Sequence, residues 1–360
     1  MKILLLSRYD RKGGSSRVRF YQYLPYLARQ GVEVKPAPLL NDDYVNRFYA
    51  GQSKNWGSII QAYWRRIAVL LKSHSYDLLW IQGELFPSLP AWGERALRLL
   101  KIPYVVDYDD AIFHRYDQHA SRVVRLMLGK KIDRVMRGAT LVIAGNNYLA
   151  ERAKKAGAER IEYLPSIIDI ERYEVRSKPK EQTLEIGWIG TQATVHYLAA
   201  IYQALSDIHS MGGVTITLLG PRDAPLEGMP YRILPWSEDK EVSEIKKFDV
   251  GIMPLPDEPW ERGKCGFKLI QYMACGLPVV GSPVGVNRDI IEQSVNGFAA
   301  ETHEEWVRAL VRLKEDPQLR HMMGQNGRKK VEEHYSLQVS APRLAELLHS
   351  ASEAQIALRH

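Results

Sequence analysis

Short apolar runs alternate with longer stretches of helical periodicity along the chain. The runs KILLLS at residues 2–7 and LEIGWI at residues 184–189 each lead into a polar, glycine-bearing loop. A short apolar run bounded by turn residues is typical of a strand buried in a parallel sheet. Further strands are expected at residues 32–35, 77–82, 103–107, 140–144, 161–164, 214–219, 232–234, 249–253 and 278–281. The alternation predicts an α/β fold built from βαβ units.

The stretches between these runs have the spacing of amphipathic helices. Helices are expected at residues 17–30, 59–72, 87–100, 121–138, 194–210, 267–274, 303–315, 317–334 and 337–351. A chain of 360 residues is too long for one ordinary core. We therefore expect an N-terminal domain at residues 1–170, a C-terminal domain at residues 171–335 and a terminal helix at residues 336–360. The polar segment SKPKEQ, residues 177–182, suits the boundary between domains.

The segment at residues 263–286, GKCGFKLIQYMACGLPVVGSPVGV, carries the strongest chemical signal. A turn from Gly263 to Gly266 opens the expected helix 267–274, and a helix N-terminus presents free N–H groups that favour an anion. Lys264 and Lys268 add positive charge there. The pattern predicts a phosphate or diphosphate site; an ordinary turn with solvated lysines is the alternative.

The run FKLIQYMACGLPVVGSPVGVNRDII, with VNGF after it, closely resembles the C-terminal signature of the family 4 retaining glycosyltransferases. That resemblance implies the GT-B fold, with two Rossmann-like domains facing each other across a cleft. It also implies sugar transfer from a UDP-, GDP- or dTDP-sugar to a cell-envelope glycan or lipid-linked acceptor, with no metal or other cofactor. The N-terminal domain would take the acceptor and the C-terminal domain the donor, and the terminal helix at 336–360 would cross back to the N-terminal domain.

The family has two glutamates eight positions apart, and this chain departs from the pattern at both. The second, which binds the donor ribose, is replaced by Gln271, whose amide can still donate and accept hydrogen bonds. The first falls on Gly263, and we expect Glu261 to cover its contact with the donor sugar. The resemblance implies a nucleotide-sugar site formed by Gly13, Gly14, Gly190, Thr191, Thr194, Trp236, Lys264, Cys265, Gly266, Phe267, Lys268 and Gln271.

Two loops of the N-terminal half complete the expected site. The loop RYDRKGGSSR lacks the G-x-G-x-x-G spacing of a dinucleotide site, and by resemblance it places Arg17 near the acceptor. The loop DYDDAIFHRYD follows a strand end, where ligands bind in open α/β sheets. The resemblance implies that Asp110 and His114 face the reacting sugar, so these two and Lys268 are the catalytic candidates. Metal binding or helix capping by the aspartates of this loop is the alternative.

Charge is distributed unevenly along the chain. Residues 1–170 hold 27 Lys and Arg against 16 Asp and Glu, whereas the remaining residues hold 22 Lys and Arg against 26 Asp and Glu. The net charge of the whole chain is +7. The basic half predicts an anionic partner. Because no nucleic-acid motif is present, a membrane surface or lipid diphosphate is favoured over nucleic acid. The stretch 56–72 and the helix 121–138 suit that surface, the latter through Arg122, Arg125, Lys130, Lys131, Arg134 and Arg137.

These features predict a cytoplasmic protein that attaches peripherally to the inner face of a membrane. The N-terminus does not resemble a signal peptide, and no run is long enough to span a bilayer. Cys265 and Cys275 flank one helix, which favours free thiols in a reducing compartment. Two other functions remain open. One is a non-catalytic module that binds nucleotide-sugar or a partner protein, which the two missing glutamates support. The other is a sugar-nucleotide epimerase, which would need catalytic carboxylates.

Overall fold

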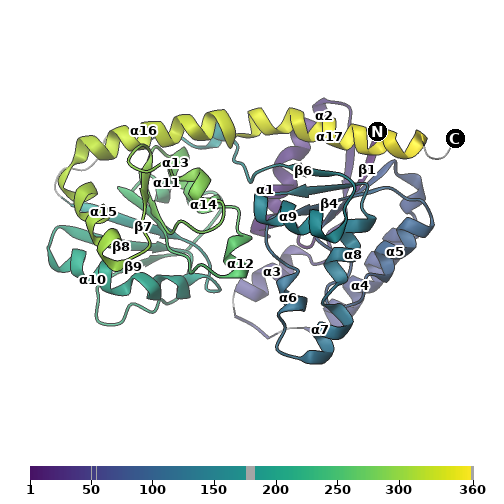
Figure 1. Cartoon of the computed structure of the whole chain (residues 1–360), viewed down its shortest axis with the longest axis horizontal. Coiled ribbons are helices and arrows are strands. Elements are labelled where there is room, and N and C mark those ends of the chain that lie inside the picture. The colour runs from purple at the N-terminus through teal and green to yellow at the C-terminus, as the bar shows by residue number, and fades with distance from the viewer. Residues whose placement is uncertain (50, 54, 176–182, 358–360) are drawn as a thin grey trace. The chain divides into compact units, whose positions relative to one another are not determined.

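The computed structural model describes residues 1–49, 51–53, 55–175 and 183–357, which form two compact units. The N-terminal unit comprises Met1–Ser166 and the C-terminal residues from Ser340 on, and the C-terminal unit comprises Ile167–Val339. The boundary segment expected at residues 177–182 lies outside the described residues. Each unit is a six-stranded parallel sheet with helices packed on its faces (Figure 1). The predicted α/β architecture with two parallel sheets is confirmed.

The sheet of the N-terminal unit has the order β2-β1-β3-β4-β5-β6. Its strands are β1 (Lys2–Leu6), β2 (Glu33–Pro36), β3 (Leu78–Gln82), β4 (Tyr104–Tyr108), β5 (Leu141–Ala144) and β6 (Ile161–Tyr163). From β1 the chain passes to β2 on one side and then to β3 on the other. The carboxyl ends of β1 and β3 therefore form a topological switch point, where open α/β sheets bind ligands.

The sheet of the C-terminal unit has the order β12-β11-β10-β7-β8-β9. Its strands are β7 (Leu184–Ile189), β8 (Val214–Leu219), β9 (Arg232–Leu234), β10 (Val250–Met253), β11 (Val279–Gly281) and β12 (Gly297–Ala299). Here the order reverses between β7 and β10, which pair in parallel. The carboxyl end of β7 is therefore the position at which this unit is expected to hold a ligand.

Helices connect the strands in both units. Those of the N-terminal unit are α1 (Gly14–Arg19), α2 (Leu24–Arg29), α3 (Asp42–Tyr49), α4 (Trp56–Leu70), α5 (Trp92–Leu99), α6 (His114–Asp117), α7 (Arg122–Leu128), α8 (Lys131–Gly138) and α9 (Asn147–Ala156). The later helices are α10 (Tyr202–Ser210), α11 (Glu241–Ile245), α12 (Pro259–Arg262), α13 (Phe267–Ala274), α14 (Asn287–Ile290), α15 (His303–Glu315), α16 (Pro317–His334) and α17 (Leu337–Ala357). None of the described helices is long and apolar enough to cross a bilayer.

Four expected helices differ from the observed ones. The helix expected at 194–210 is a 3₁₀ helix at Val195–Ile201, and α10 begins only at Tyr202. The single helix at 17–30 is wrong: α1 begins at Gly14 and ends at Arg19, and α2 is a separate helix with Pro25 in its first turn. Proline favours a helix start because it lacks the N–H that would bond within the helix. The helix expected at 87–100 begins only at Trp92.

The single basic helix at 121–138 is also wrong. It is divided into α7 and α8 at Gly129, a residue of low helix propensity. The break turns α8 so that Ile132, Val135 and Met136 pack into the core. It also buries Lys131, which forms an ion pair with Glu84. The six basic residues therefore do not share one solvent-exposed face.

Candidate functional site

The turn before α13 requires a glycine at its last position. Gly266 is the N-cap of α13 and has φ of 64°, a left-handed conformation that glycine adopts without strain. A Cβ atom there would lie 2.2 Å from Cδ1 of Ile290. The turn is thus tightly packed against the segment around α14, and the helix that it opens has the bounds expected from the sequence.

Two lysines of this turn and helix lie near the carboxyl end of β7. Lys268 Nζ is 4.3 Å from the ring centroid of Trp188 in β7, and Lys264 Nζ is 5.8 Å from that of Tyr197, which follows β7. Burial, and then the charge of Lys264, lowers the pKa of Lys268 to about 7. The aromatic rings stabilise the ammonium groups only in part. A ligand anion placed here would favour the charged form of Lys268.

Glu261 lies beside the same group of residues. It is buried, and its carboxylate accepts a hydrogen bond from the hydroxyl of Tyr197. Gly263, which occupies the place of the first family glutamate, ends α12 two residues later. A carboxylate is therefore present near the turn, although two positions earlier than in the family pattern.

Gln271 and Trp236 belong to one buried hydrogen-bond network. The amide nitrogen of Gln271 donates to the hydroxyl of Tyr173 at 3.2 Å, and that hydroxyl donates to Glu241 at 3.2 Å. The indole N–H of Trp236 donates to the other oxygen of Glu241 at 2.6 Å. Gln271 is only 2% exposed. Burial, and then Glu241, raises the pKa of Tyr173. The structure thus connects Gln271, the expected ribose residue, with Trp236 of the expected nucleotide-sugar site through two residues that the sequence did not single out.

The remaining donor candidates of the C-terminal unit lie directly after β7 or in the turn before α13. A Cβ atom on Gly190 would be 2.3 Å from the ring of Trp188, so this position needs a glycine. The hydroxyl of Thr194 accepts from the backbone N–H of Thr191 and donates to its carbonyl, both at 3.2 Å. Cys265 and Cys275 are both buried, and neither forms a disulfide.

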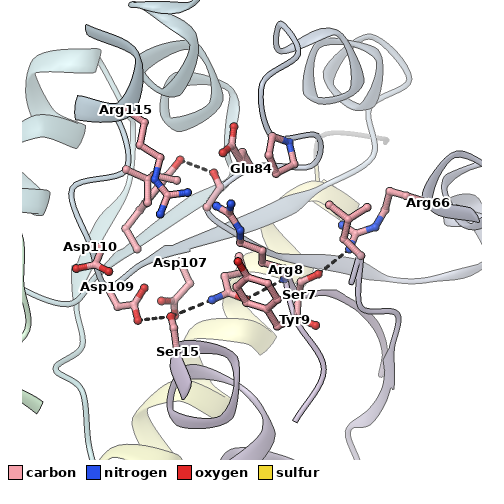
Figure 2. A pocket seen from close by; sticks show the side chains of 16 residues that line it. Ser7, Arg8, Tyr9, Ser15, Arg66, Glu84, Asp107, Asp109, Asp110 and Arg115 are labelled. Atoms are coloured by element: carbon pink, nitrogen blue, oxygen red, sulfur yellow. Dashed lines mark hydrogen bonds between the residues drawn. The ribbon is translucent and has the colours of Figure 1, made fainter. Parts of the chain in front are cut away.

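A pocket of about 140 Å³ lies in the N-terminal unit at the carboxyl ends of β1, β3 and β4 (Figure 2). It occupies the switch point of that sheet. Charged and polar side chains that line it include Ser7, Arg8, Tyr9, Ser15, Arg66, Gln82, Glu84, Asp107, Asp109, Asp110 and Arg115. Such a concave site with convergent polar groups is the expected form of a binding pocket.

Gln82 at the end of β3 positions the glycine-serine loop at the edge of this pocket. Its carbonyl oxygen accepts from the backbone N–H of Arg8 at 2.9 Å and from the hydroxyl of Ser16 at 2.7 Å, and its amide donates to Ser15 at 2.9 Å. Ser15 in turn donates to Asp109. A Cβ atom on Gly13 would lie 2.4 Å from Cβ of Tyr9, whereas Gly14 has no such neighbour.

The structure brings only some of the expected N-terminal residues to this pocket. Asp110 lines it, but Arg17 is buried outside the lining. His114 also lies outside: Nδ1 is 2.8 Å from the Asp117 carboxylate and Nε2 is 2.8 Å from the Tyr148 hydroxyl. Both ring nitrogens therefore have protein partners. In the described part of the chain, no three acidic, histidine or cysteine side chains cluster closely enough to hold a metal ion.

Asp107, at the floor of the pocket, is paired within the protein. Arg19 donates to its two oxygens at 2.8 and 3.1 Å, and both side chains are buried. Arg19 also donates to the carbonyl groups of Leu164 and Pro165. Burial raises the pKa of Asp107 to about 6 despite the neighbouring guanidinium. Asp107 therefore holds the unit together and is not a free carboxylate for a ligand.

Two family models match the chain. The Glycosyl transferase 4-like domain matches residues 10–166, and Glycosyl transferases group 1 matches residues 232–330. These matches include the glycine-serine loop and most of the pocket in the N-terminal unit, and the segment from β9 to α16 in the C-terminal unit. A comparison with curated protein sequences finds no match.

Several solved structures share the fold. HepE of Anabaena in complex with UDP-glucose is 19% identical, with a TM-score of 0.72 over 97% of this chain and all of that one. The sucrose-phosphate synthase of Thermosynechococcus elongatus is 14% identical, with a TM-score of 0.70 over 98% of this chain and all of that one. A glycosyltransferase from Rickettsia africae is 14% identical, with a TM-score of 0.69 over 97% of this chain and 98% of that one. The fold is the GT-B fold.

Proposed function

Because the chain belongs to the group 1 glycosyltransferases of the family 4 type, we propose that it transfers a sugar from a nucleotide-sugar to an acceptor with retention of anomeric configuration. The C-terminal unit would bind the donor and the N-terminal unit the acceptor. HepE, a protein of the same fold, binds UDP and UDP-glucose in its solved complexes. UDP-sugars are therefore the first donors to examine, before GDP- and dTDP-sugars.

One observation carries this proposal: Lys264 and Lys268 gather at the switch point of the C-terminal sheet. There the partly uncharged Lys268 lacks the stabilisation that an anion would supply. A nucleoside diphosphate leaving group gains charge as its bond to the sugar breaks. Ammonium and N–H groups placed at that charge would lower the barrier. The buried network of Gln271, Tyr173, Glu241 and Trp236 would hold the nucleoside part beside it.

The test is a panel of UDP-, GDP- and dTDP-sugars, with hydrolysis and nucleotide binding measured on wild type and Gln271→Ala. We expect one donor to be hydrolysed, and Gln271→Ala to weaken nucleotide binding by about 1–3 kcal/mol, the usual effect of an unmet polar partner. Tyr173→Phe is the matched control because it keeps the Gln271 amide, and it should weaken nucleotide binding less than Gln271→Ala does. Unchanged nucleotide affinity in Gln271→Ala would exclude the ribose contact.

The same panel separates the two other functions. Nucleotide binding without turnover of any donor would indicate a non-catalytic module. Conversion of the donor to its epimer would indicate a sugar-nucleotide epimerase. For an active transferase, proton NMR of the newly formed product gives the anomeric configuration, and an inverted product would contradict retention.

We further propose that the acceptor is a cell-envelope glycan or a lipid-linked glycan, collected by an enzyme that lies on the cytoplasmic face of an anionic membrane. Support comes from α4, where Trp56, Ile60 and Trp64 are 68%, 57% and 67% exposed. They recur every four residues and therefore lie along one face of the helix. An exposed apolar face with basic neighbours is the pattern of a helix that lies in a membrane interface.

A further inference from the structure

Two arginines of the N-terminal pocket have no carboxylate partner among the residues that the structure describes. Arg66 of α4 is 3% exposed and donates to the backbone carbonyls of Ser7 and Ala37 at 2.6 and 3.1 Å. Nε of Arg8 is buried and has no hydrogen-bond partner among the described residues. In that part of the chain, no carboxylate lies within the 4.0 Å of an ion pair from either guanidinium. In Figure 2 Arg66 lies beside Ser7, and Arg8 extends toward Glu84 and Arg115.

The carboxylates around the pocket already have partners. Glu84 forms an ion pair with Lys131 and accepts from the hydroxyl of Tyr116. Asp107 is held by Arg19, and Asp109 accepts from Ser15. Asp110 and Arg115 line the pocket together, and the carboxylate acts on the guanidinium electrostatically. Arg8 and Arg66 therefore line this pocket without a carboxylate at ion-pair distance among the described residues.

A buried charge without a counter-charge is costly, and Arg66 shows this effect. Burial lowers the pKa of Arg66 to about 9. For Arg8, burial acts to lower the pKa, but Tyr9 and Glu84 outweigh it and raise the value. Buried charges in proteins are normally paired, because desolvation without a counter-charge is unfavourable. The planar guanidinium group is suited to a phosphate or carboxylate, which it can bind through two parallel hydrogen bonds.

We propose that the acceptor carries an oxyanion, a phosphate or a carboxylate, and that Arg8 binds it in this pocket with Arg66 as the second positive charge. The inference rests on the proposed function, in which this pocket receives the acceptor. A sugar phosphate, a uronic acid or the phosphate that joins a glycan to its lipid would each supply the group. A neutral sugar alone would leave both arginines unmatched.

The experiment measures binding of inorganic phosphate, glucose 1-phosphate, glucuronate and glucose to the full chain saturated with UDP. Phosphorus NMR serves for the phosphates and saturation-transfer NMR for the sugars. We expect phosphate and the anionic sugars to bind and glucose to bind more weakly. Arg8→Gln should lower the affinity for the anions roughly tenfold or more, the usual effect of losing a charge-assisted hydrogen bond. Preference between glucose 1-phosphate and glucuronate identifies the oxyanion.

Two controls keep the outcome decisive. Arg95→Gln removes the same charge from an exposed position of α5 in the same unit and should change nothing. Arg8→Lys keeps the positive charge. If it retains part of the anion affinity, the loss in Arg8→Gln is due to the missing charge and not to misfolding. Three results would each overturn the inference. Phosphate would not bind to wild type, or the affinity would fall equally in Arg8→Gln and Arg95→Gln, or UDP at saturation would displace the phosphate. UDP binding, measured on the same samples, tests the proposed function independently.

Discussion

At the scale of single residues, the lysines of the C-terminal unit show how burial changes chemistry. Lys264 and Lys268 are four positions apart, and both were expected to add positive charge at the donor site. Lys268 is packed over Trp188, and its pKa is lowered to about 7, whereas Lys264 lies near Tyr197. At pH 8 most of Lys268 is therefore uncharged when no ligand is bound. A bound diphosphate would raise the pKa again, so ligand binding and protonation are coupled.

We predict that nucleotide binding at pH 8 takes up a proton. A diphosphate favours the charged lysine, so the number of protons taken up per nucleotide bound should approach one. For the same reason the nucleotide affinity should fall as the pH rises above 7. Calorimetry in two buffers of different ionisation enthalpy measures the uptake. Lys268→Met keeps the apolar contact with Trp188 but should abolish most of the uptake. If the variant takes up as many protons as wild type, another group is responsible.

At the scale of elements, α4 performs different tasks on its two faces. Ala62 and Arg66 are buried, and Tyr63 donates to the carbonyl of Pro87 at 2.6 Å. The opposite face exposes Trp56, Ile60, Trp64, Ile67 and Leu71. The helix thus connects the lining of the pocket with an apolar surface. In the other stretch expected to contact a membrane, α8 buries its apolar residues, whereas α7 also exposes Val123, Leu126 and Met127.

We predict that the exposed face of α4 binds anionic vesicles. Trp64→Gln should weaken binding by about tenfold, because a side chain of this size contributes 1.5–3 kcal/mol when fully buried. Sedimentation with phosphatidylserine vesicles and with neutral vesicles measures the effect, and high salt should weaken it. Met322→Gln, an exposed apolar position of the C-terminal unit, is the matched control. Equal binding to both vesicle types, or an equal effect of the control, would contradict the proposal.

At the scale of the molecule, the compact units do not follow the order of the chain. Residues from Ser340 on belong to the N-terminal unit although they follow the C-terminal unit directly in sequence. Leu344, Leu347 and Leu348 are buried, and Arg343 forms an ion pair with Glu162 at 2.9 Å. Stability of the N-terminal unit should therefore depend on the end of the chain.

We predict that Leu344→Ala destabilises the N-terminal unit alone. Removal of a fully buried leucine side chain lowers the free energy of unfolding by about 2–5 kcal/mol, through lost burial and the cavity that remains. Hydrogen exchange followed by mass spectrometry should show faster exchange in β1 to β6 and little change in β7 to β12. Val339→Ala is the control, since Val339 is an exposed residue of the same helix. Equal acceleration in both sheets would contradict this assignment.

The sequence by itself determined the elements and their order. Most strands and the helices at 267–274, 303–315 and 317–334 have nearly the bounds that hydrophobic periodicity predicts, because that periodicity reflects local geometry and burial. The signature segment was enough to identify the family. The errors occurred at Pro25 and Gly129, where one continuous pattern covers two helices, since periodicity alone does not show a change of direction.

Only the tertiary structure decided which polar groups meet. Gln271 bonds to Tyr173, 98 positions away, and Lys131 is neutralised by Glu84, 47 positions away. Arg8 and Arg66 are a further example. That neither has a carboxylate partner among the described residues follows only from the positions of the acidic side chains around the pocket. Such pairings depend on which side chains the packed core brings together. Local spacing cannot encode them, because a charge in the sequence looks the same whether it is later solvated, paired or left to bind a ligand.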